Sequence, residues 1–117
     1  MILVTHDLGV VAQVCDRVVV MYGGVVAEEN DAAALYAAPQ HPYTQQLLLS
    51  FPDLAHPDRP LRGIPGSPPR LDAMPTGCRF APRCPHAFER CTLRPPEYPV
   101  AGGRAACFLR DPAEARP

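Results

Sequence analysis

The chain has 117 residues, a formal net charge of −1, 47% hydrophobic residues and sixteen prolines. This length suits one small domain, which buries only about two thirds of its extended-chain surface. No stretch approaches the roughly 18 apolar residues of a membrane span, and no charged leader precedes a cleavage-type sequence, so the sequence favours neither an embedded nor a secreted protein.

Proline and charge are distributed unevenly along the chain. Fourteen of the sixteen prolines follow Ser50, which predicts a boundary near residue 51 between a regular part, 1–51, and a loop-rich part, 52–117. Residues 1–58 carry a net charge of −6, whereas residues 59–110 carry nine arginines against three acids, a net charge of +6. The basic tail therefore favours an anionic neighbour, such as the acidic first half, lipid headgroups or a negatively charged cluster.

An apolar run opens the chain and ends at Thr5, His6 and Asp7. This pattern predicts a strand buried on both faces, as in the parallel sheets of α/β proteins. Ligands in such folds bind beyond the carboxyl ends of the strands, which is where His6 falls.

Asp7 is expected to cap a helix that runs from Leu8 to Cys15, because its carboxylate can accept the first amide hydrogens. We expect this role for Asp7 rather than a catalytic one. The helix places Leu8, Val11, Val14 and Cys15 on one stripe, so Cys15 is expected to pack as a small hydrophobe.

Two β-branched runs, Val18 to Tyr22 and Val25 to Ala27, flank the pair Gly23-Gly24, which predicts a tight hairpin. After it, Asn30 or Asp31 is expected to cap a short helix that stops before Pro39.

His41-Pro42 predicts the start of a further helix, because proline suits the first helical position. One face of that helix is expected to dock on the sheet through Tyr43, Leu47, Leu48 and Phe51.

The segments Leu3 to Ala12 and Cys15 to Gly24 resemble the switch-histidine region of ABC transporter ATP-binding subunits. The run His41-Pro42-Tyr43-Thr44 and the Pro- and Cys-rich tail are similar to those of the oligopeptide/dipeptide (peptide and nickel) importers. The resemblance covers about Ile2 to Leu109. It implies an α/β fold that is part of a P-loop NTPase (ABC ATPase) domain, followed by an irregular C-terminal tail.

The resemblance also implies a function. Such subunits couple ATP binding and hydrolysis to peptide uptake, and His6 then contacts the γ-phosphate of Mg-bound ATP, positioning the attacking water. The implied partners are a second ATP-binding subunit, two transmembrane permease subunits and an extracytoplasmic peptide-binding protein. The implied location is the inner face of the plasma membrane, in the cytoplasm.

Several motifs of a complete ATPase are missing from the sequence. All eleven basic residues are arginines, so there is no phosphate-loop lysine, and no Walker B or signature motif is present. The chain therefore resembles only the C-terminal part of such a subunit, from a truncated reading frame or a fragment. We expect no ATPase activity from it alone.

Four tail cysteines, Cys78, Cys84, Cys91 and Cys107, have the spacing C-x5-C-x6-C-x15-C. Four thiolates suit either a [4Fe-4S] cluster or tetrahedral zinc, and these spacings exceed the short knuckles of common zinc sites. We therefore expect an iron-sulfur cluster of structural or redox-sensing role, with zinc and unliganded thiols as alternatives. The neighbouring arginines, available to offset a cluster's charge, are Arg79, Arg83, Arg90, Arg94 and Arg104. His86 is expected at the surface rather than as a ligand.

Two other functional classes fit parts of the sequence. Arginine beside cysteine suggests a nucleic-acid module, but the tail has few aromatic residues and no recognisable motif, so no nucleic-acid partner is expected. The alternative to a transporter subunit is a stand-alone cysteine-cluster binding module, or a remnant without function.

Overall fold

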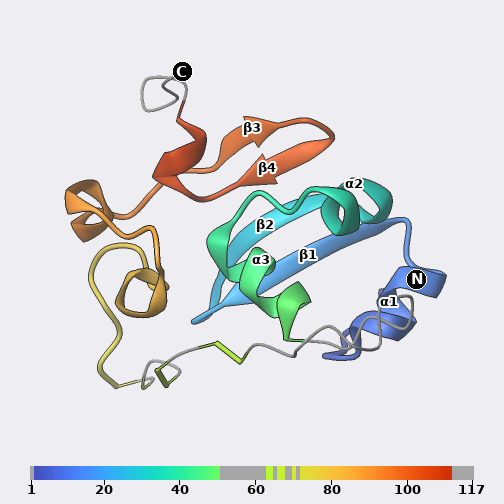
Figure 1. Ribbon diagram of the computed structural model, residues 1–117, viewed down its shortest axis with the longest axis horizontal. Helices are drawn as coiled ribbons and strands as arrows, with labels where there is room; N and C mark the ends of the chain where they lie inside the picture. Colours follow the sequence, from blue (N-terminus) through green and yellow to red (C-terminus); the bar gives the residue numbers. More distant parts are fainter. Residues whose placement is uncertain (1, 51–62, 65, 68–69, 71, 112–117) are drawn as a thin grey trace.

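The computed structural model describes residues 2–50, 63–64, 66–67, 70 and 72–111. In these residues the helices lie on one face of a four-stranded antiparallel sheet with the strand order β1-β2-β4-β3 (Figure 1). The elements are α1 (Leu8–Val14), β1 (Arg17–Tyr22), β2 (Val25–Asp31), α2 (Ala32–Ala37), α3 (Pro42–Leu49), β3 (Tyr98–Val100) and β4 (Gly103–Ala105), with 3₁₀ turns at Ala81–Arg83, Glu89–Thr92 and Phe108–Arg110.

The predicted hairpin around the glycine pair is confirmed. Gly23 and Gly24 have φ angles of 59° and 84°, the left-handed conformation that a two-residue connection between twisted strands requires. The register shifts between Val20 and Met21, so the hairpin carries a β-bulge. β2 continues to Asp31, beyond the predicted end at Ala27.

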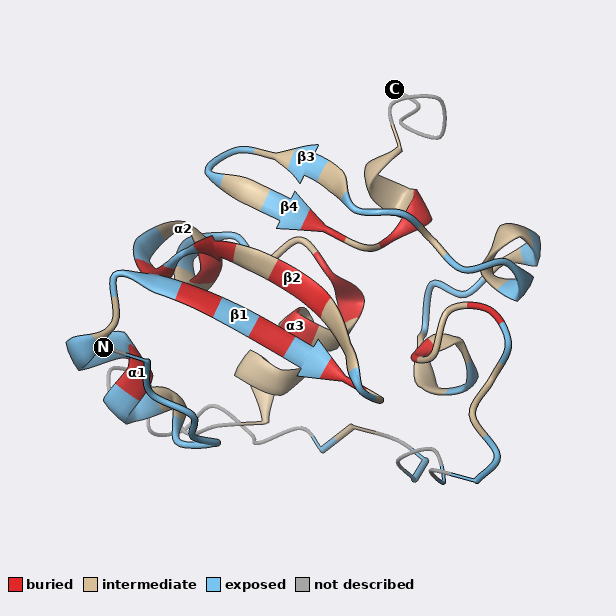
Figure 2. Ribbon diagram, turned by 180° about the vertical axis from the view of Figure 1, so that it is seen from behind, coloured by how far each residue is buried: buried red, intermediate tan, exposed pale blue. Residues whose placement is uncertain are grey.

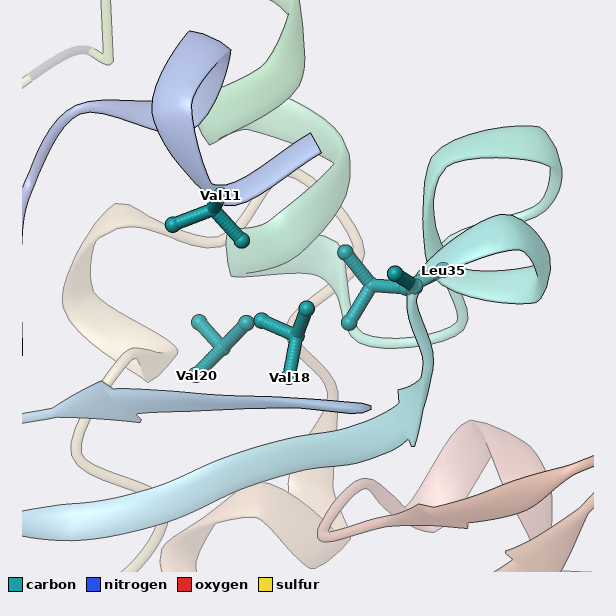
Figure 3. Close-up of a cluster of buried hydrophobic side chains, with 5 residues drawn as sticks. Val11, Val18, Val20 and Leu35 are labelled. Carbon is teal, nitrogen blue, oxygen red and sulfur yellow. The ribbon is translucent and has the colours of Figure 1, made fainter. Parts of the chain in front are cut away.

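Burial alternates residue by residue along β1, as expected for a strand with one face on the core (Figure 2). Val18 and Val20 are buried, whereas Val19 and Met21 are 51% and 57% exposed. The buried pair points towards Val11 of α1 and Leu35 of α2, so both helices cover the same face of the hairpin (Figure 3).

α1 begins where the sequence predicts and ends at Val14, one residue before the predicted end. Its buried stripe is narrower than expected, because Val11 is buried but Val14 is 53% exposed. Cys15 is partly buried against the core cluster, which agrees with its expected packing role.

α2 begins after Asp31, but the Asp31 carboxylate makes no capping hydrogen bond; Asn30 Oδ1 instead accepts from the Asp31 amide at 2.8 Å.

α3 begins at Pro42 as predicted, and Tyr43 and Leu47 pack against the core. Phe51, predicted on the same face, lies outside the described residues.

The strand predicted at the start of the chain is wrong for this structure. Residues 2–7 form no strand, and Ile2 and Val4 are 92% and 93% exposed. An interior parallel strand requires neighbours on both sides. Among the described residues, every strand belongs to an antiparallel sheet and none pairs with this segment. The α/β class therefore holds, but the described sheet is not parallel.

The tail contributes two strands that the sequence analysis missed. β3 and β4 form a hairpin across Ala101-Gly102, and β4 pairs with β2 through Glu28–Ala105 and Glu29–Arg104. Gly103 permits this approach, because a Cβ there would lie 1.9 Å from the Glu29 carbonyl oxygen. Both halves of the chain thus build one sheet, and the boundary near residue 51 stays a prediction.

Among the described residues, none of the helices has the length and apolar character needed to cross a membrane.

Candidate functional site

His6 lies in the segment that leads into α1, and its side chain is exposed. Asp7 Oδ1 accepts hydrogen bonds from the amides of Gly9 at 3.0 Å and Val10 at 3.2 Å, which confirms the predicted cap. Thr5 Oγ1 accepts from the Asp7 amide at 3.0 Å. The Asp7 carboxylate is therefore committed to the helix terminus, while His6 remains open to solvent.

The four tail cysteines line one cavity of about 10 Å³, roughly the space of one water molecule. The backbone brings the first and third together, because the Cys78 amide donates to the Cys91 carbonyl at 3.0 Å. Gly77 makes this crossing possible, since a Cβ there would lie 2.4 Å from the same carbonyl oxygen. The other walls of the cavity come mainly from aromatic rings and histidines: Phe80, Phe88, Phe108, His41 and His86.

Burial governs the ionisation of these thiols. Loss of hydration raises the pKa of Cys78 and of Cys84, and raises the pKa of Cys107 to about 11. The three thiols are therefore neutral at physiological pH in the absence of a bound cation. Among the described residues, no group of three or more His, Cys, Asp or Glu side chains is arranged to hold a metal ion. The donors match a four-ligand site in number and chemistry, but their arrangement is not that of a closed site.

The arginines expected to offset a cluster's charge mostly have other partners. Arg79 Nη1 donates to the Gly23 carbonyl and Arg83 Nη1 to the Tyr22 hydroxyl, so both hold the tail against the β1–β2 hairpin. Arg104 forms an ion pair with Glu29 at 2.8 Å.

Arg90 lies over the Phe108 ring, 4.2 Å from its centroid, and pairs with Asp111 at 3.1 Å. The sequence analysis expected the basic tail to lie near an anionic partner such as the acidic first half, and the ion pair between Arg104 and Glu29 is one such contact.

A buried carboxylate that the sequence analysis missed links β2 to α3. Glu28 is fully buried, and its Oε1 accepts from the amides of Gln40 at 3.0 Å and His41 at 2.8 Å. His41 is 4% exposed, and its Nδ1 accepts from the Tyr43 amide at 2.9 Å. Burial lowers the pKa of His41 from 6.5 to about 4, so the ring is neutral and acts as a cap. The sequence of β2, VVAEEND, gave no signal for burial at Glu28, because burial does not alternate there: the adjacent residues Ala27 and Glu28 are both buried.

A larger cleft of about 470 Å³ lies beside the cysteine cavity. Its walls are the start of β2, from Val25 to Ala27, and the tail segments Gly77–Phe80 and Arg94–Glu97. His41, Cys78, Phe80 and Pro95 line both cavities, so the cleft adjoins the cysteine cavity. No sequence motif indicated this cleft, because segments far apart in the chain build it.

Comparisons with known proteins find relatives that are oligopeptide or dipeptide transport ATP-binding proteins. The oligopeptide transport ATP-binding protein OppD of Salmonella typhimurium is 47% identical over 108 residues, which cover 92% of this chain and 32% of OppD. The oligopeptide transport ATP-binding protein AppD of Bacillus subtilis is 46% identical over 92% of this chain and 34% of its own length. The dipeptide transport ATP-binding protein DppD of Escherichia coli is 44% identical over 82% of this chain and 29% of its own length. The chain thus spans about a third of the length of the curated relatives it matches.

The family described as "Oligopeptide/dipeptide transporter, C-terminal region" matches residues 27–91. This range covers most of β2, both following helices and three of the four tail cysteines. Since the match spans more than half of the 117 residues and agrees with the peptide-importer resemblance of the sequence, the chain belongs to the oligopeptide/dipeptide transporter C-terminal-region family.

Proposed function

We propose that the chain acts as the C-terminal part of the ATP-binding subunit of a peptide-type ABC importer, which couples ATP binding and hydrolysis to uptake of oligopeptides or dipeptides. The observation that carries this proposal is the 46–47% identity to OppD and AppD across 92% of the chain. These relatives match both the part before Ser50 and the tail, so a stand-alone cysteine module is not favoured. The proposed domain is a partial P-loop NTPase domain with an irregular Pro- and Cys-rich tail.

The proposal extends to the partners. A second ATP-binding subunit, two transmembrane permease subunits and an extracytoplasmic peptide-binding protein complete the proposed assembly, with this subunit on the cytoplasmic face of the plasma membrane. The printed names of the relatives, which are transport ATP-binding proteins, support this arrangement.

Within that assembly, His6 is proposed to contact the γ-phosphate of ATP, which the remainder of the subunit holds together with Mg²⁺. An imidazole donates a hydrogen bond to a phosphate oxygen and can carry a charge near neutral pH. The solvent exposure of His6 supports this role, as does the commitment of the adjacent Asp7 carboxylate to the cap of α1. His6 is then the phosphate contact, and Asp7 fixes the start of α1 directly after it.

ATP turnover tests this role. The isolated chain is expected to hydrolyse no ATP, since it has no lysine for a phosphate loop. In a subunit that carries this chain behind a phosphate-loop segment, His6→Ala is expected to lower turnover by roughly a hundredfold or more. His86→Ala, which removes another exposed imidazole, is the matched control and is expected to leave turnover unchanged. Full turnover in the His6→Ala subunit would remove His6 from the mechanism.

We also propose that Cys78, Cys84, Cys91 and Cys107 hold a metal group, in the first place a [4Fe-4S] cluster and alternatively zinc. The convergence of all four thiols on one cavity supports the proposal. The cavity's small volume requires the sulfurs to move apart around a cluster. Bound iron or zinc stabilises thiolates, and the group's role is structural or redox-sensing.

Metal analysis after anaerobic purification tests this site. The expected result is about four iron and four sulfide per chain with absorbance near about 400 nm, lost in Cys84→Ser and retained in Cys15→Ser. One zinc per chain would select the alternative, and a metal-free chain would leave the four as thiols. Neither result alters the ATPase proposal, which rests on His6 and on the relatives.

A further inference from the structure

The 470 Å³ cleft beside the start of β2 has the size of a small-ligand site, for which about 300–1,000 Å³ is usual. Its lining includes the end of β1, at Met21 and Tyr22, and the start of β2, from Val25 to Ala27. The tail contributes Gly77–Phe80, Arg94–Glu97 and Ala106, the residue that follows β4.

The edge of β2 that faces this cleft lacks a strand partner among the described strands. β4 pairs with β2 only at Glu28 and Glu29, and the Ala106 amide then donates to the Ala27 carbonyl at 2.8 Å. Beyond Ala106 the chain turns away into the 3₁₀ turn at Phe108–Arg110. The positions beside Val25 and Val26 that a longer β4 would occupy are therefore part of the cleft. An open strand edge is the structural element to which extended peptides add as a further strand.

The charges of the cleft favour a carboxylate. Arg79 and Arg94 line it, and Arg94 is exposed with no hydrogen-bond or ion-pair partner among the described residues. Glu97 also lines it, but its Oε2 is paired with Arg104 Nε at 2.7 Å. The lining thus has an excess of positive charge next to apolar walls.

We propose that this cleft binds a short extended peptide carrying a carboxylate, which adds to the open edge of β2 and pairs its carboxylate with Arg94. A simple anion uses only the guanidinium groups, whereas a peptide also uses the strand edge and the apolar walls. This combination selects a peptide over acetate or phosphate. The inference does not depend on the proposed role in ATP hydrolysis, because no part of the cleft involves His6.

Amide chemical shifts of the 15N-labelled 117-residue chain provide the test. The probe is the peptide Val-Thr-Val-Thr-Val with a free C-terminal carboxylate. We expect saturable shifts at Val25, Val26 and Ala106, and roughly tenfold weaker binding of the C-terminally amidated peptide. The same peptide with alternate amides N-methylated is expected not to bind, since it cannot complete a strand ladder.

Arg94→Gln is expected to weaken binding of the free-carboxylate peptide roughly tenfold and to leave binding of the amidated peptide unchanged. Arg70→Gln is the matched control: Arg70 is exposed, pairs with Asp72 and lies outside the cleft, so binding is expected to stay at the unmodified level. Neither variant removes a core contact.

Three results would overturn the inference. The first is an absence of shifts at the β2 edge at high peptide concentration. The second is equal binding of the N-methylated peptide, because strand addition is then excluded. The third is displacement of the peptide by acetate or phosphate at equal concentration, which would make the cleft an anion site only.

Discussion

His41 makes the stability of this chain depend on pH in a window where few other groups titrate. Its ring is buried, its Nδ1 accepts the Tyr43 amide, and burial lowers its pKa from 6.5 to about 4. The unfolded chain therefore takes up a proton at His41 at higher pH than the folded chain does. The stabilising contribution of neutral His41 is fully present above about pH 6.5 and decreases as the pH falls from about 6.5 to about 4. Below about pH 4 His41 causes no further loss of stability.

The size of the effect follows from the two pKa values. One unit of pKa difference corresponds to about 1.4 kcal/mol, so the full loss at His41 is about 3 kcal/mol. Between about pH 7.5 and about pH 5 the expected loss is about 2 kcal/mol. Arg110, whose positive charge also disfavours the protonated ring, adds to the depression that burial causes.

Urea unfolding followed by far-ultraviolet circular dichroism at the two pH values measures this loss. Asparagine at position 41 keeps a side-chain acceptor at the helix cap but does not titrate. The fall in the free energy of unfolding between about pH 7.5 and about pH 5 is therefore expected to be about 2 kcal/mol smaller in His41→Asn than in the unmodified chain. His86→Asn, at an exposed position, is expected to behave like the unmodified chain. Equal losses in the unmodified chain and His41→Asn would refute the buried, neutral histidine.

Three further predictions concern single contacts. Glu28→Gln is expected to lower the free energy of unfolding by about 2 kcal/mol, because it removes a fully buried carboxylate that accepts hydrogen bonds from two backbone amides. Glu97→Gln, at an exposed position, is expected to cost less than about 1 kcal/mol. Gly103→Ala is expected to cost more than about 2 kcal/mol, because its Cβ would collide with the Glu29 carbonyl. At Gly63 a Cβ would meet no described atom within 4 Å, so Gly63→Ala is expected to change the free energy of unfolding by no more than about 0.5 kcal/mol. Urea unfolding measures all four variants, and equal losses within either pair would contradict the assigned contact. Iodoacetamide is expected to alkylate Cys107 in the folded, metal-free chain roughly a hundredfold more slowly than in the urea-unfolded chain, because burial raises the pKa of the thiol to about 11. Mass spectrometry measures both alkylation rates, and similar rates would show that the fold does not protect Cys107.

Local features of the fold were predictable from the residues nearby. The Gly23-Gly24 hairpin, the Asp7 cap and the start of α3 at Pro42 each depend on only a few consecutive residues. The strand expected before His6 was wrong, because an apolar run forms an interior strand only where neighbouring strands accept it. The hairpin of β3 and β4 was missed because its strands are short and one contains Pro99, which the edge position of β3 tolerates.

In the candidate sites, too, some features were predictable from the sequence and others depend on the fold. Identity and spacing of the four tail cysteines indicated a shared site, and the fold places all of them around one cavity. The raised pKa values of Cys78, Cys84 and Cys107 depend on how the tail packs against the sheet, because burial causes them. The same packing decides that Arg79 and Arg83 contact the β1–β2 hairpin. The cleft proposed to bind a peptide had no sequence signal, since its lining combines the β1–β2 hairpin, His41 and two tail segments that lie far apart in the chain.

The sequence by itself determined the family, the hairpin, the Asp7 cap of α1 and the residue types available for chemistry, because each of these depends on residue identity or on neighbours close in the chain. Only the tertiary structure decided that β4 joins β2, that Glu28 and His41 are buried together, and that Arg94 and the start of β2 line one cleft. The physical reason is that burial and electrostatic environment arise from contacts between distant segments, and these contacts exist only once the tail has folded against the sheet.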